Sequence, residues 1–304
     1  STKKDRVAFC GYHGWHDWYL AANLADDKNL DGHLLPGLEP VGVPRALLKS
    51  ALPFTYNHME ELEHIIQTHD DIGTIIMEPI RHTEPNNRFL EKVREVARRI
   101  GAVLIFDEIS SGWRLTVGGA HLKYKVYPDL AVFSKAMSNG FPMAAVIGKR
   151  KIMDVAQRSF ISSTAWTERT GPAAALAAIK KMKAKNVPEH LDRIGKLIGK
   201  GWKRLAEKHG LDISLTGPHA LITFSFNYPN AQELKTLFTQ EMLTRGYLAT
   251  LTVYVSLSHT ERHIKAYLAE VDEVFGLMKK AINSGNVSQL LEGPVAQSGF
   301  KRLT

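Results

Sequence analysis

The feature that most constrains the fold of this chain is a pair of apolar runs separated by a helical pattern. Ile72–Met77 is a short apolar run that ends at Glu78, and Ala102–Phe106 is a second run that ends at Asp107. Between them, apolar residues of Arg88–Ile100 recur at the spacing of a helix. Continuous apolar runs are typical of parallel strands buried on both faces. We therefore expect an α/β fold with a mainly parallel sheet covered on both sides.

Two more apolar runs extend the same pattern. Leu130–Phe133 leads into Lys135, and Met143–Ile147 follows it. In open α/β sheets, ligands bind outside the carboxyl ends of the strands. In this chain those ends carry Glu78, Asp107 and Lys135, which are the first candidates for a site.

The C-terminal part has a different order of elements, so a second domain is expected. A helix that begins near Pro172 is interrupted around Val187, and the domain boundary is placed there. This gives a large domain of residues 1–187 and a smaller α+β domain of residues 188–304. The elements expected in the second domain are helices 189–209, 231–245 and 261–283 and a strand at 221–226.

Composition excludes some classes of protein. The formal charge is +8, but Lys and Arg are mixed with Asp and Glu and form no nucleic-acid motif, so no nucleic-acid partner is expected. No apolar run reaches the roughly 18 residues of a membrane span, so no membrane partner is expected. Cys10 is the only cysteine, which excludes an internal disulfide and fits a cytoplasmic location.

Asp107 and Lys135 together suggest cofactor chemistry. Pyridoxal phosphate needs a lysine amine that bonds its aldehyde carbon and a carboxylate that keeps its pyridine nitrogen protonated. Burial would lower the pKa of such a lysine and leave it a neutral nucleophile. Taken alone, the spacing of the two residues fits a helix-capping aspartate and a surface lysine better than a cofactor site, because many α/β proteins have such residues.

Local sequence shifts this balance, because five segments resemble the class III aminotransferases in the family's order along the chain. The similarity is greatest to the branch that contains glutamate-1-semialdehyde 2,1-aminomutase. It implies the type I fold of pyridoxal-phosphate-dependent transferases. The segments are Gly11–Gly14, Leu104–Arg114, Gly118–Ala120, Pro128–Pro142 and Ser258–Glu261.

The resemblance implies roles for residues around the cofactor ring. Lys135 would form the Schiff base, and Asp107 would pair with the pyridine nitrogen. Tyr12 would stack on one face of the ring and Ile109 would pack on the other, while Ser110 would reach the phenolic oxygen.

Further cofactor contacts are implied more loosely. His13 belongs to the segment of the stacking tyrosine, and Glu78 matches a glutamate at a strand end. Thr167 corresponds to a threonine that binds the cofactor phosphate from the neighbouring subunit, with Thr164 as the next candidate. Glu84 corresponds to a glutamate that gates the access of substrate, although its spacing differs from that of the family.

The expected function is that of a homodimeric, pyridoxal-phosphate-dependent aminotransferase that acts on an amino donor and a carbonyl acceptor. An intramolecular aminomutase is the alternative within the family. The family has a long region before the Gly11–Gly14 segment that cradles the cofactor phosphate, whereas ten residues precede this segment here. A non-catalytic remnant of the fold is therefore a further alternative.

A metal site is the remaining alternative. His13, His16 and Asp17 lie within five positions, but their spacing is loose and no cysteine framework accompanies them. Metal binding is therefore not expected. The sequence has neither the nucleophile elbow of an α/β-hydrolase nor a Walker-type phosphate loop.

Overall fold

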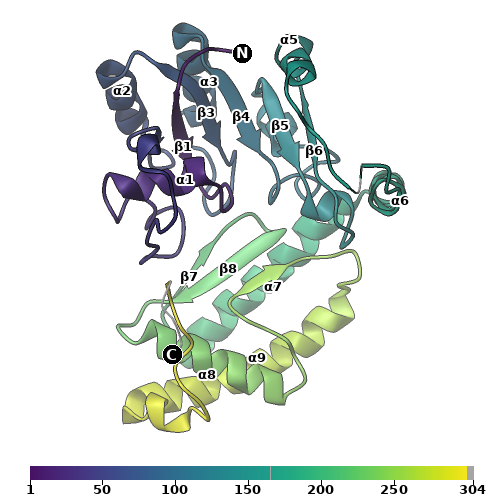
Figure 1. Cartoon of the computed structure of the whole chain (residues 1–304). Helices are drawn as coiled ribbons and strands as arrows, with labels where there is room; N and C mark the ends of the chain where they lie inside the picture. The colour runs from purple at the N-terminus through teal and green to yellow at the C-terminus, as the bar shows by residue number, and fades with distance from the viewer. Residues whose placement is uncertain (165, 300–304) are drawn as a thin grey trace. The chain divides into compact units, whose positions relative to one another are not determined.

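A computed structural model of the chain describes residues 1–164 and 166–299 (Figure 1). Within these residues, no helix combines the length and the apolar character that a membrane crossing requires.

The chain divides into two compact units. The first contains Ser1–Ile80 and Pro85–Lys185, and the second contains Arg81–Glu84 and Asn186–Ser298. The functional division predicted near Val187 stays a prediction.

The first unit is built on a six-stranded sheet in the order β2-β1-β3-β4-β5-β6. All neighbouring strands are parallel except β5 and β6, which are antiparallel. The predicted α/β fold with a mainly parallel central sheet is confirmed. The strands are β1 (Arg6–Cys10), β2 (Ala51–Pro53), β3 (Ile72–Met77), β4 (Val103–Asp107), β5 (Leu130–Phe133) and β6 (Ala145–Gly148).

One face of the sheet is covered by α2 (Met59–Thr68) and α3 (Phe89–Ile100). The apolar stripe predicted for α3 is buried, and Gly101 ends the helix in the left-handed conformation, as predicted. Its side chains pack against alternate strand residues such as Ile75 and Leu104. This packing fixes the strands whose carboxyl ends carry the candidate site.

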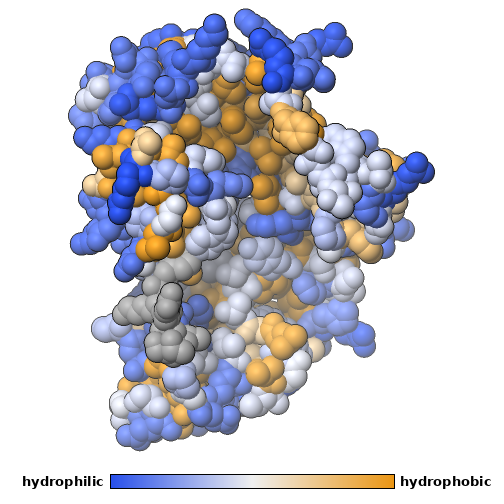
Figure 2. Space-filling view, viewed as in Figure 1, coloured by the Kyte–Doolittle hydropathy of each residue, from blue (hydrophilic) through white to orange (hydrophobic). Residues whose placement is uncertain are grey.

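The opposite face is covered only in part by the described residues. Phe9 of β1 packs under Tyr19 of α1 (Asp17–Leu20), but hydrophobic side chains remain visible over β4 and β5 (Figure 2). On this face Ile105 of β4 and Val132 of β5 are half-buried, whereas Leu104 and Phe106 on the other face are buried. The run predicted at Met143–Ile147 is not a buried strand, because β6 is an edge strand in which Ile147 is 55% exposed.

The register of the parallel strands places three residues at one level. Cys10 pairs with Met77, and Met77 pairs with Phe106. The next residue of each strand, namely Gly11, Glu78 and Asp107, therefore emerges at the same edge of the sheet.

Further helices complete the first unit, and the second unit is a three-stranded sheet with helices. In the second unit, Trp202 and Phe224 lie in the core with ring centroids 4.7 Å apart. The helix predicted at 189–209 begins two residues earlier, because Val187 and Pro188 open it rather than break it. The remaining elements are α4 (Ala120–Tyr124), α5 (Arg150–Met153), α6 (Thr170–Ala184), α7 (Val187–His209), β7 (Ile213–Thr216), β8 (Leu221–Phe226), α8 (Ala231–Thr244), β9 (Thr252–Tyr254) and α9 (Glu261–Ser284).

Candidate active site

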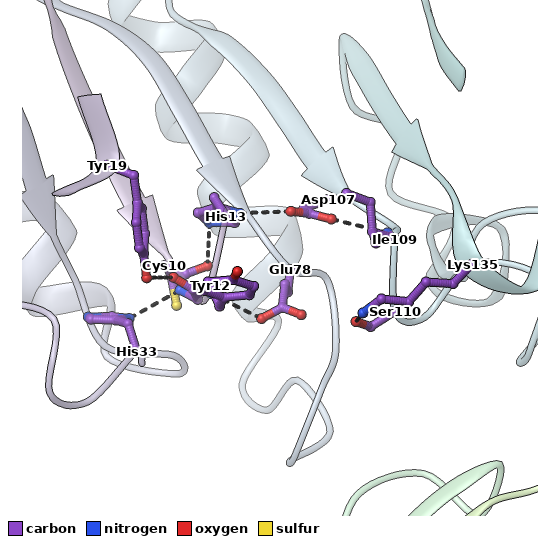
Figure 3. A network of polar contacts seen from close by, with 11 residues as sticks. Cys10, Tyr12, His13, Tyr19, His33, Glu78, Asp107, Ile109, Ser110 and Lys135 are labelled. Atoms are coloured by element: carbon purple, nitrogen blue, oxygen red, sulfur yellow. Dashed lines mark hydrogen bonds and ion pairs between the residues drawn. The ribbon is translucent and has the colours of Figure 1, made fainter. Parts of the chain in front are cut away.

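The residues predicted at the strand ends form a network of polar contacts in the first unit (Figure 3). Asp107 is level with Val132 of β5, and Lys135 follows three residues later, so both lie at the same edge. The prediction that Glu78, Asp107 and Lys135 share one edge of the sheet is confirmed by the strand register.

Asp107 is a buried carboxylate with two partners on its own chain. Its Oδ1 accepts a hydrogen bond from the Ile109 amide at 3.1 Å, and its Oδ2 lies 2.9 Å from Nδ1 of His13. The other ring nitrogen of His13 lies 3.2 Å from the carbonyl oxygen of Cys10. Both ring nitrogens face oxygen acceptors, so only a doubly protonated His13 donates in both contacts.

Lys135 lies at the start of the turn after β5. Its Nζ donates to Oγ of Ser110 at 2.8 Å, and the two side chains extend toward each other in Figure 3. Lys135 is exposed in the structure, whereas the sequence suggests a buried lysine. Its φ of +45° is a left-handed conformation that costs a non-glycine residue about 1–3 kcal/mol and often marks functional positions.

Tyr12 is oriented through its backbone and by other aromatic rings. Its amide donates to Oε2 of Glu78 at 3.2 Å. The buried Glu78 therefore binds the backbone of Tyr12 at the carboxyl edge of the sheet. The Tyr12 ring makes edge-to-face contacts with Trp15 and Tyr19 at centroid distances of 6.0 and 6.1 Å. Ile109 is half-buried two residues beyond Asp107.

Two residues of this network were not predicted from the sequence. The Gly11 amide donates to Nδ1 of His33 at 3.1 Å, and the Tyr19 hydroxyl donates to the Gly11 carbonyl at 3.0 Å. No motif marks either residue, because each meets Gly11 only through the fold of the segment after β1. Cys10 lies beside them, but burial and the nearby Glu78 raise the pKa of its thiol, so it is no nucleophile.

Glu108, for which the sequence indicates no role, is fully buried. Its carboxylate accepts hydrogen bonds from the Ser111 hydroxyl at 2.6 Å and from the amides of Ala120 and His121 at 2.8 and 2.9 Å. Nδ1 of His121 is a fourth neighbour at 3.0 Å. Glu108 therefore ties the end of β4 to the start of α4 and holds the loop that carries Ile109 and Ser110.

The structure places the remaining predicted residues in other segments of the chain. Thr164 and Thr167 are both exposed. Glu84 belongs to the second unit. His16 is exposed, and residues 1–164 and 166–299 contain no group of three His, Cys, Asp or Glu side chains suited to a metal.

The donor set fits the ring of pyridoxal phosphate. A buried carboxylate held by two donors suits a protonated pyridine nitrogen, and an exposed amine beside a hydroxyl suits the aldehyde carbon and the phenolic oxygen. The Tyr12 ring supplies an aromatic surface at the same edge.

Comparison with known proteins gives a consistent result. The model of the family "Aminotransferase class-III" matches residues 2–275. A 3-aminobutyryl-CoA aminotransferase of Cloacimonas acidaminovorans is 30% identical over 90% of this chain and 67% of its own length. A glutamate-1-semialdehyde 2,1-aminomutase of Methanothermobacter thermautotrophicus is 29% identical over 91% of this chain and 70% of its own length. The chain thus spans about two thirds of the length of these relatives.

Solved structures show the same fold. The FumI protein of Sphingopyxis sp. MTA144, in its PLP internal aldimine form, superposes with a TM-score of 0.82 at 21% identity, over 95% of this chain and 69% of that protein. With the family model covering most of the sequence, the chain belongs to the class III aminotransferases, a family of pyridoxal-phosphate-dependent enzymes that move amino groups.

Proposed function

We propose that Lys135 carries the cofactor in an amino-transfer reaction and that Asp107 binds the pyridine nitrogen. The observation that carries this proposal is the shared sheet edge: a buried, doubly bound carboxylate on β4 and an amine after β5, both in the first unit. In open parallel sheets, ligands bind outside the carboxyl ends of the strands, which is this edge.

Asp107, His13 and Lys135 have separate roles in the proposed reaction. Bound pyridoxal phosphate supplies an aldehyde carbon that bonds amines and a pyridinium ring that withdraws electrons. The Asp107 carboxylate would hold the proton of the pyridine nitrogen, and His13, which lies against its Oδ2, would keep the carboxylate oriented. Nζ of Lys135 would bond the aldehyde carbon of the cofactor, and as a free amine it would hold and move a proton beside the reacting carbons.

The remaining side chains of the proposed site would bind and orient the cofactor ring. The hydroxyl of Ser110, which accepts from Lys135 in the structure, would donate to the phenolic oxygen. Tyr12 and Ile109 would hold the two faces of the ring, with Tyr12 kept in place by the bond from its amide to Glu78. We assign these contacts to the large domain, residues 1–187, and a smaller domain to residues 188–304.

We also propose a homodimer in which Thr167 binds the phosphate of the partner's cofactor. In support, the segment around Thr167 is unusually apolar for its exposure: Phe160 is 97% exposed and Trp166 is 68% exposed. Exposed aromatic residues of this kind are typical of association surfaces. Sedimentation of the wild-type chain beside the Phe160→Ser variant tests this, because the variant should shift toward monomer. The cytoplasmic location stays a prediction.

Enzymes of this family act on an amino donor and a carbonyl acceptor, and we propose intermolecular transfer for this chain. The similarity to glutamate-1-semialdehyde 2,1-aminomutases favours one alternative, an intramolecular shift. The two differ in one requirement, since only intermolecular transfer consumes an external carbonyl acceptor.

The test is an amino-transfer assay with the chain loaded with pyridoxal phosphate. The donor screen starts with amino acids and with the 3-amino acyl thioester and the semialdehyde named in the relatives. We expect a carbonyl product that needs both an external acceptor and Lys135, with the Lys135→Ala variant as control. Product from the semialdehyde without any acceptor would favour the aminomutase. Failure of the chain to retain the cofactor would contradict the proposal and support the non-catalytic alternative.

A further inference from the structure

Gly11 is the residue through which the strand β1 passes into the segment of Tyr12 and His13. Its φ is +109°, and a Cβ at this position would lie 2.7 Å from Oε2 of Glu78. Both polar groups of its backbone are bound by side chains from later in the sequence. His33 accepts from the amide at 3.1 Å, and Tyr19 donates to the carbonyl at 3.0 Å.

His33 can hold this bond only as a neutral imidazole. Nδ1 accepts from the Gly11 amide, so the single ring proton lies on Nε2. Burial lowers the pKa of His33 to about 4, and the nearby His13 contributes in the same direction. The ring also packs against Phe9, with centroids 5.3 Å apart. Around neutral pH the acceptor is therefore always available.

The residues on either side of Gly11 carry the contacts of the proposed site. The Cys10 carbonyl faces Nε2 of His13, and the Tyr12 amide donates to Glu78. The other nitrogen of His13 binds Asp107. A rotation of the peptide between Cys10 and Gly11 would move all three contacts, and the amide of that peptide is the group that His33 binds.

We infer that His33 is a positioning residue of the proposed site: through the Gly11 amide it fixes the orientation of Tyr12 and His13. The inference rests on the proposed function, because positioning matters only if a cofactor binds at this edge. His33 itself touches neither Lys135 nor Asp107 in any described contact. Its role is therefore distinct from that of the residues already assigned.

The test compares His33→Asn with His33→Leu. Asn carries Oδ1 on the same Cγ that carries Nδ1 in His, so it keeps an acceptor, whereas Leu keeps bulk and has none. We expect the Kd for pyridoxal phosphate to rise about tenfold in His33→Leu, the value of one lost hydrogen bond, and to stay near wild type in His33→Asn. His64→Leu, at an exposed position of α2, is the matched control.

A second readout needs no cofactor. Cys10 is the only cysteine, so ¹³C-carbonyl cysteine with ¹⁵N glycine labels the Gly11 amide alone for NMR. Hydrogen exchange of that amide should be at least about tenfold faster in folded His33→Leu than in wild type or His33→Asn.

The outcomes separate the inference from the proposed function. The inference would be overturned if hydrogen exchange of the Gly11 amide were unchanged in His33→Leu. It would also be overturned if exchange became faster while the Kd for pyridoxal phosphate stayed the same. In either case, cofactor binding by the wild-type chain would leave the proposed function standing. Absence of cofactor binding in the wild-type chain would overturn both, whatever the exchange rates. Equal loss of affinity in His33→Asn and His33→Leu would also overturn it, because the acceptor would then be irrelevant.

Discussion

Replacement of Glu108 by Gln tests whether the loop after β4 is held by a buried carboxylate. Glu108 is fully buried, and its two oxygens accept from two backbone amides and one hydroxyl and face one imidazole nitrogen. Glutamine has the same shape, but one of its oxygens becomes an NH₂ group. Whichever way it turns, that group faces either the Ala120 amide or the His121 amide, donor against donor.

The magnitude depends on the hydrogen bonds that the substitution removes. A buried amide without an acceptor costs about 1–3 kcal/mol. The remaining bonds lose the extra strength that an ionised acceptor gives. We expect Glu108→Gln to lower the free energy of unfolding of the first unit by about 2–4 kcal/mol. Ser111→Ala, which removes one hydroxyl donor, should cost about 0.5–1.5 kcal/mol.

Urea unfolding followed by circular dichroism measures the change, with Glu39→Gln as the control at an exposed position. Glu39→Gln should stay within about 0.5 kcal/mol of wild type, as surface substitutions usually do. A loss for Glu108→Gln below about 1 kcal/mol would refute the reasoning, because it would mean that the amides of Ala120 and His121 find other acceptors at no cost.

Three further predictions concern the site. Asp107→Asn keeps the shape but loses the charge that holds the pyridinium, so cofactor affinity should fall about 10- to 100-fold in a fluorescence titration; an unchanged Kd would contradict the assignment. Gly11→Ala forces a Cβ against Glu78 at a positive φ and should cost about 1–3 kcal/mol in urea unfolding, and a neutral result would mean that the turn relaxes freely. The pKa of folded His33, about 4, lies below its ordinary 6.5, so the unfolded chain binds the proton first as pH falls. Wild type should then lose about 2–3 kcal/mol more stability than His33→Asn between pH 6.5 and 4, with no difference above 6.5; parallel curves in that interval would contradict it.

The sequence was sufficient to predict the parts of the fold that depend on local pattern. The runs at 72–77 and 130–133 form β3 and β5 with the predicted bounds, because a buried strand needs a continuous apolar run wherever it lies. The amphipathic pattern of α3 was equally clear. The shared edge of Asp107 and Lys135 followed from the parallel order of these strands.

Features that depend on neighbours were not predicted. The apolar composition of β6 suggests a buried strand, but no strand pairs with its second edge among the described residues, and its side chains are exposed. Lys135 is exposed for a similar reason, since a strand end does not tell which residues cover it. His33 and Tyr19 bind Gly11 from 22 and 8 positions away through an irregular segment, for which no periodicity gives a signal.

Lys135 is the proposed attachment point of the cofactor, and one measurement tests this assignment most directly. The chain is incubated with pyridoxal phosphate, reduced with borohydride, freed of excess reagent and mapped by mass spectrometry of its peptides, beside Lys135→Ala. We expect close to one cofactor per chain, fixed on the peptide that contains Lys135, and no comparable modification in the variant. Cofactor spread over other exposed lysines, with Lys135 unmodified, would contradict the assignment.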